Sequence, residues 1–78
     1  MRKDMRPVSV WETDSMMRTL TDVEGAALFL LTKWPTAEDT TLHLAARQAA
    51  LDALDGKSSV EAFRAALVAA AEEAGILA

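Results

Sequence analysis

Apolar residues between Thr21 and Pro35 recur at steps of three and four, which is the spacing of one face of an α-helix. Thr21 and Glu24 have the spacing of a capping box, in which two side chains satisfy free N–H groups at a helix start. Pro35 ends the helix because proline has no N–H and disfavours the α conformation in the preceding residue. The pattern therefore predicts a helix from Thr21 to Trp34. The residues expected on its buried face are Val23, Ala26, Ala27, Leu30, Leu31 and Trp34, and those expected beside this face are Leu28 and Phe29.

The segment before this helix alternates between apolar and polar residues, as half-buried strands do. Val8 and Val10 point one way in an extended chain, and Trp11 points the other. Two short strands joined near residues 13–15 predict a β-hairpin, although a turn without glycine leaves its register open. A lone hairpin is marginal in water, so we expect it to pack on the helices. Its outer edge is also a candidate for pairing with a second copy of the chain.

Two further helices follow. The second is expected to begin at Asp39 or Thr40 and to end near Asp55, because Gly56 offers a C-terminal stop. The third is expected to begin at Ser58 and to end at Gly75, a residue suited to the left-handed conformation. The residues expected on the inner face of the second helix are Leu42, Ala45, Ala46, Ala49 and Ala53, and those expected on the apolar face of the third are Val60, Phe63, Ala66, Leu67, Ala70 and Ala74.

The predicted architecture is an α+β fold, a two-stranded β-hairpin followed by three α-helices (β-β-α-α-α). Residues 7–78 are expected to form one small domain, and residues 1–6 a flexible tail whose cations Arg2, Lys3 and Arg6 are solvated. A chain of 78 residues buries only about 60% of its unfolded surface, so its stability is marginal. With no cysteine for disulfides, close helix packing and oligomerisation are the remaining ways to stabilise it.

Charge and hydropathy argue against several classes of function. The net charge is −4 and the pI is near 4.7, whereas a nucleic-acid-binding protein usually presents a basic face. The longest apolar run, Ala26–Leu31, is far shorter than the ~20 residues that span a bilayer. The basic N-terminus is followed by no apolar segment of a secretory signal. We therefore expect a cytoplasmic protein that does not bind membranes. Binding to nucleic acid is disfavoured by the acidic net charge.

Polar candidates for a site are few. Asp39, His43 and Arg47 lie four residues apart on one helix face, where His43 could act as a metal ligand or general base oriented by Asp39. We favour a surface ladder of ion pairs, because a metal would need further ligands and nothing in the sequence points to them. Trp11 and Trp34 could line a pocket, but core packing is the favoured interpretation. The sequence thus predicts no catalytic residue, no metal and no cofactor.

Leu44 and Leu51 lie a heptad apart, roughly opposite the alanine face of the second helix. With Val8 and Val10 of the hairpin, they are the predicted self-association surface. The leading hypothesis is therefore a non-enzymatic protein-interaction module that acts as a homodimer, with an unidentified protein as a further partner. The alternative is a nucleic-acid-binding or transcription-associated regulator that uses the last two helices as a helix-turn-helix pair. Against it, the third helix exposes Glu61, Glu72 and Glu73, which repel phosphate.

Several segments together resemble a known family. They are PVSV at 7–10, WP at 34–35, AALDALDG at 49–56 and AFRAALVAAAEEAGIL at 62–77. In this combination the chain resembles short alphaproteobacterial hypothetical proteins grouped as domain of unknown function 982. It departs from the family pattern at Asp14-Ser15, where a glycine is expected in the turn. The resemblance implies the same small fold in a bacterial cytoplasm, and it implies no activity and no catalytic residue.

Overall fold

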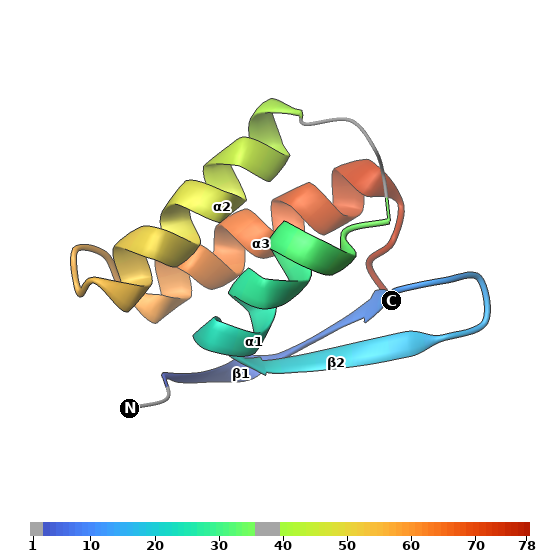
Figure 1. The fold of residues 1–78 in the computed structure, drawn as a ribbon, viewed down its shortest axis with the longest axis horizontal. Coiled ribbons are helices and arrows are strands. Elements are labelled where there is room, and N and C mark those ends of the chain that lie inside the picture. The colour runs from blue at the N-terminus through green and yellow to red at the C-terminus, as the bar shows by residue number, and fades with distance from the viewer. Residues whose placement is uncertain (1–2, 36–39) are drawn as a thin grey trace.

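The computed structural model describes residues 3–35 and 40–78. Along the chain the elements are β1 (Asp4–Trp11), β2 (Met17–Asp22), α1 (Val23–Leu28), η1 (Phe29–Lys33), α2 (Thr41–Leu54) and α3 (Val60–Ala74). β1 and β2 form an antiparallel hairpin. η1 is a π-helical turn that continues α1. The hairpin followed by three helices confirms the predicted α+β fold (Figure 1).

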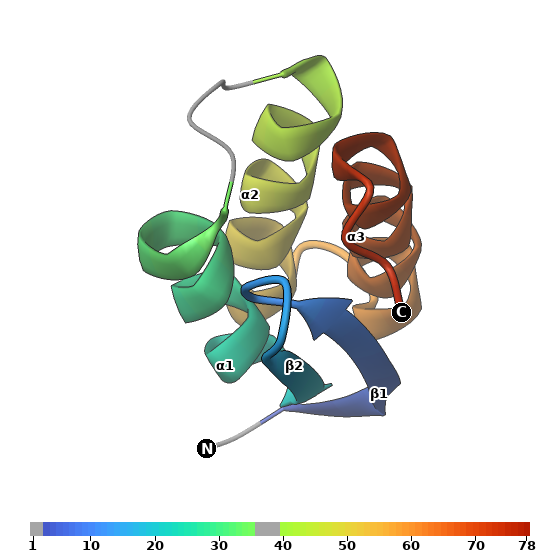
Figure 2. The same ribbon diagram turned by 90° about the vertical axis from the view of Figure 1, so that its right-hand side faces the viewer.

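The fold has two layers. The hairpin covers one side of the helices, and α2 lies on the side of the helix layer that faces away from it (Figures 1 and 2). The core between the layers is built from alternate residues of the strands and from one face of each helix. Its largest fully buried side chains are Phe29, Phe63, Leu30, Leu67, Val10 and Val23.

The hairpin extends further toward the N-terminus than the sequence indicated. β1 begins at Asp4 and Met5 is buried, so residues 4–6 belong to the domain and the predicted tail boundary at residue 6 is wrong. The segment is fixed because the Lys3 N–H donates to the Glu24 carboxylate, the Lys3 ammonium donates to the Ala53 carbonyl, and the Val23 N–H donates to the Lys3 carbonyl. A lysine at this place also complements the negative end of α2.

The outer edge of β1 is closed by the chain itself. The Trp11 N–H donates to the Ile76 carbonyl at 2.7 Å, and the Ala78 N–H donates to the Ser9 carbonyl at 2.9 Å. The Arg64 guanidinium donates to the carbonyls of residues 6 and 7 at 3.1 Å each. These contacts satisfy groups that an edge strand would otherwise present to another chain. The expectation that this edge pairs with a second copy is therefore wrong for β1.

The start of α1 differs by one residue from the prediction. The N-cap is Asp22, whose carboxylate accepts the Gly25 N–H at 2.6 Å, because Thr21 is still part of β2. A Cβ at residue 25 would lie 2.8 Å from the Asp22 carboxylate oxygen. Glycine at this place therefore leaves room for the cap.

The π-helical turn changes which side chains enter the core. Phe29 is fully buried, whereas Leu31 is 56% exposed, the reverse of the helical pattern in the sequence. A π-turn has more residues per turn than an α-helix, so side chains after Leu28 are rotated relative to the predicted face. Leu30 remains buried, and Trp34 adopts the extended conformation (ψ 126°) expected before proline.

α2 and α3 have the expected bounds to within one or two residues. Thr40 caps α2 by accepting the His43 N–H, Ser59 rather than Ser58 caps α3, and Gly75 has φ 73°. The Ile76 N–H then donates to the Ala71 carbonyl at 3.0 Å, a hydrogen bond typical of a Schellman motif. The inner face of α2 is rotated, because Leu42 and Ala45 are exposed; its buried residues are His43, Ala46, Ala50 and Ala53.

Candidate functional site

His43 lies in the interior. Its side chain is 5% exposed, its Nε2 lies 3.1 Å from the Leu30 carbonyl oxygen, and its ring stacks on Trp34 with centroids 4.9 Å apart. The ladder of Asp39, His43 and Arg47 was predicted to lie on the surface, and for His43 that position is wrong. Arg47 is half-buried, and Asp39 lies outside the described residues.

The Leu30 carbonyl is available to His43 because of where the π-turn ends. In π-helical pairing this carbonyl would accept from the N–H five residues later. That residue is Pro35, which has no N–H. A carbonyl only accepts, so Nε2 of His43 carries the proton in this hydrogen bond. The imidazole thus satisfies a carbonyl that the helix end leaves without its regular partner.

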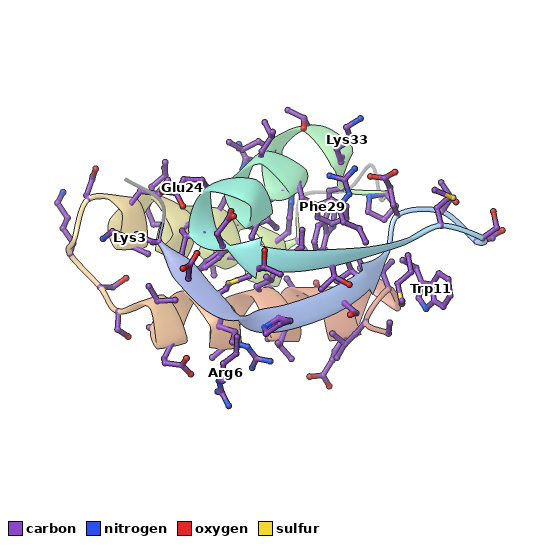
Figure 3. All side chains as sticks on the ribbon, turned by 90° about the horizontal axis from the view of Figure 1, so that it is seen from below. Lys3, Arg6, Trp11, Glu24, Phe29 and Lys33 are labelled. Carbon is purple, nitrogen blue, oxygen red and sulfur yellow. The ribbon has the colours of Figure 1, made fainter. Side chains whose placement is uncertain are left out.

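Aromatic side chains surround this contact. Phe29 and Trp34 meet edge to face, with centroids 5.7 Å apart and an interplanar angle of 72°. The Arg18 guanidinium lies 5.9 Å from the centre of the Phe29 ring and forms an ion pair with Glu12 at 3.0 Å. Figure 3 shows Phe29 between β2 and η1. The arrangement connects the end of η1 to α2 and to the hairpin.

A shallow pocket of about 270 Å³ lies at the hairpin end. Its lining residues include Trp11, Glu12, Pro35 and Ile76. Trp11 points outward at the end of the molecule that carries the hairpin turn (Figure 3), while Trp34 is not among the lining residues. This pocket therefore does not bring the two indoles together. The volume is also below the ~300 Å³ at which sites for small molecules usually begin.

Residues 3–35 and 40–78 hold neither a metal-binding cluster nor a membrane-spanning helix. No group of three or more His, Asp or Glu side chains there is arranged to hold a metal ion. No helix in the same ranges has the length and apolar character needed to cross a bilayer. The described residues thus give no geometric basis for a metal centre.

The predicted self-association residues fall into two groups. Val8 and Val10 are buried in the core, so their side chains cannot belong to a contact surface, and that part of the prediction is wrong. Leu44 and Leu51 are on the surface, 47% and 52% exposed, and Leu54 joins them at 36%. We call Leu44, Leu51 and Leu54 the α2 leucine stripe; their spacings of seven and three are those of a helix-packing seam.

The last two helices do not present a basic face. Glu61, Glu72 and Glu73 are exposed on α3. Arg64, the one arginine of that helix, donates to carbonyls of β1. Phosphate would therefore meet like charge along the exposed side of α3.

Comparison with known proteins gives one match. The model of the family described as "Protein of unknown function (DUF982)" matches residues 6–78. No curated protein and no solved structure matches the chain. The match confirms that part of the predicted resemblance which concerns the DUF982 family.

Proposed function

The chain belongs to the DUF982 family, and for this member we propose a non-enzymatic protein-interaction module that acts as a homodimer. Its partner is a second copy of itself, and further protein partners bind the assembled module. We also propose the bacterial cytoplasm as its location, on the resemblance to short alphaproteobacterial proteins. The proposal includes no cofactor.

One observation carries this proposal: large leucine side chains lie exposed on neighbouring helices. Leu28 is exposed on α1 and Leu31 on η1. The α2 leucine stripe is exposed on the next helix in the sequence. Isolated exposed leucines are normal, but several on adjoining elements of so small a domain are typical of a protein contact surface. Burial of a leucine contributes roughly 1.5–3 kcal/mol, so contact between two copies would add substantially to a small core.

The proposal is tested by sedimentation equilibrium of the unmodified protein over a range of micromolar concentrations. We expect a weight-average mass that rises from 8.4 kDa toward twice that value. A mass that stays at that of the monomer throughout the range contradicts the homodimer.

The nucleic-acid alternative has less support, because the exposed side of α3 is acidic and Arg64 is engaged with β1. Titration with duplex DNA at low salt measures it directly. We expect no salt-dependent shift, and a shift that weakens as salt rises would favour the alternative.

A further inference from the structure

The strongest unassigned surface is the exposed side of α2. The helix lies on the side of the molecule away from the hairpin (Figures 1 and 2). Along this helix Leu44, Arg47, Leu51 and Leu54 follow one another at steps of three and four, as the a and d positions of a coiled coil do. The row adjoins the core face of α2, since Arg47 follows the buried His43, and Leu54 the buried Ala50, by four residues.

We propose that two copies of the chain join through α2, with the two helices antiparallel and the α2 leucine stripes in contact. This inference rests on the proposed homodimer and names the surface that forms it. In the antiparallel a-to-d arrangement, Leu44 of one copy lies opposite Leu54 of the other. Arg47 then lies opposite Leu51 of the second copy.

Charge selects this orientation. In a parallel pair in register, Arg47 would face Arg47, so like charges would meet in the seam. In the antiparallel pair, the Arg47 stem packs on Leu51 of the second copy, and its head lies one turn from Asp55 of that copy. Antiparallel helix dipoles are also favourable, because unlike ends adjoin.

The hairpin offers a weaker place for self-association. The outer edge of β1 is occupied by residues 76–78 and by Arg64. β2 is short and carries Arg18, a charged residue of the kind that discourages edge pairing. Pairing through α2 leaves both hairpins at the outer ends of the dimer, where they remain accessible to other proteins.

The chain has no cysteine, so single cysteines can report which positions meet. Two single variants, Leu44→Cys and Leu54→Cys, are purified with tags of different mass, mixed and oxidised gently. A disulfide forms only where two Cα atoms approach within about 7 Å. We expect the mixed 44–54 disulfide dimer to exceed each like-with-like dimer by at least about tenfold, since antiparallel contact favours only that pair.

Two controls fix the interpretation. Ala45→Cys is exposed on the same helix but lies outside the stripe, and it should cross-link at least about tenfold less than the mixed pair. Thr19→Cys reports contact through β2 and should also cross-link poorly. Dominance of the 44–44 dimer would overturn the antiparallel orientation, and efficient cross-linking at residue 19 would overturn the choice of surface.

Failure of this inference is distinguishable from failure of the homodimer. If the unmodified protein sediments as a dimer while the 44–54 pair does not cross-link, the homodimer stands and the α2 surface is wrong. If the unmodified protein remains a monomer at every concentration, both proposals fall together.

Discussion

His43 donates a hydrogen bond from Nε2 to the carbonyl oxygen of Leu30, 3.1 Å away. The contact joins α2 to the last turn of η1 and satisfies a carbonyl that Pro35 cannot serve. The chain's one histidine therefore has a structural role that depends on the π-helical turn.

Replacing His43 by phenylalanine tests that role. The ring can still stack on Trp34, but the buried Leu30 carbonyl loses its donor, and we expect a loss of about 1–3 kcal/mol in the free energy of unfolding. His43→Gln, which keeps an N–H donor, should lose less. Urea denaturation measures both variants, and equal stability of His43→Phe and the unmodified protein would show that the hydrogen bond contributes nothing.

A second prediction concerns the side chains of the π-turn: Phe29 should contribute far more to stability than Leu31. Phe29→Ala should cost about 3–5 kcal/mol, because Phe29 is fully buried and its removal leaves a cavity. Leu31→Ala should change stability by about 0.5 kcal/mol or less, because Leu31 is mostly exposed. Thermal unfolding of the two variants provides the comparison. A larger loss for Leu31→Ala would support a regular α-helix through this segment.

Short-range patterns in the sequence were sufficient to predict the order of the strands and helices and the position of most helix ends. Pro35, Thr40 and Gly75 end or begin helices for reasons of backbone chemistry that act within a few residues. Val8 and Val10 share one face of β1, as their alternation indicates, although that face is buried in the core and is not the predicted contact surface. These features could be predicted because each depends on neighbours along the chain.

Features that depend on distant segments could not be predicted in this way. The π-turn accompanies the reversed burial of Phe29 and Leu31, and His43, expected on the surface, lies in the core on the buried face of α2. The single bridge between Val10 and Leu77 involves too few residues for any alternating pattern. Tertiary packing selected these arrangements over the simple helical period.

The Asp22 cap and Gly25 should be energetically coupled. Asp22→Ala alone should cost about 0.5–2 kcal/mol of unfolding free energy. In that background Gly25→Ala should gain up to about 1 kcal/mol from helix propensity. In the unmodified protein the gain should vanish, because the new Cβ would crowd the Asp22 carboxylate at 2.8 Å. A double-mutant cycle measures the coupling, and equal effects of Gly25→Ala in both backgrounds would rule it out.

The segment that closes the β1 edge should protect the protein against aggregation. Ile76 is buried and its carbonyl accepts the Trp11 N–H. Ile76→Ala should therefore cost about 2–5 kcal/mol and expose the strand edge more often. Leu77→Ala, at a half-buried position, is the control and should cost less. Light scattering during mild heating should rise first in Ile76→Ala; coincident curves for both variants would argue against edge protection.

The account depends most on the claim that the α2 leucine stripe holds two folded copies together. The direct measurement is sedimentation velocity of the unmodified protein beside a Leu44→Glu/Leu54→Glu double variant, with Leu42→Glu as an exposed control outside the stripe. We predict that the unmodified protein and the control approach twice 8.4 kDa as concentration rises, while the double variant stays folded and monomeric. A double variant that dimerises as the unmodified protein does would contradict the claim.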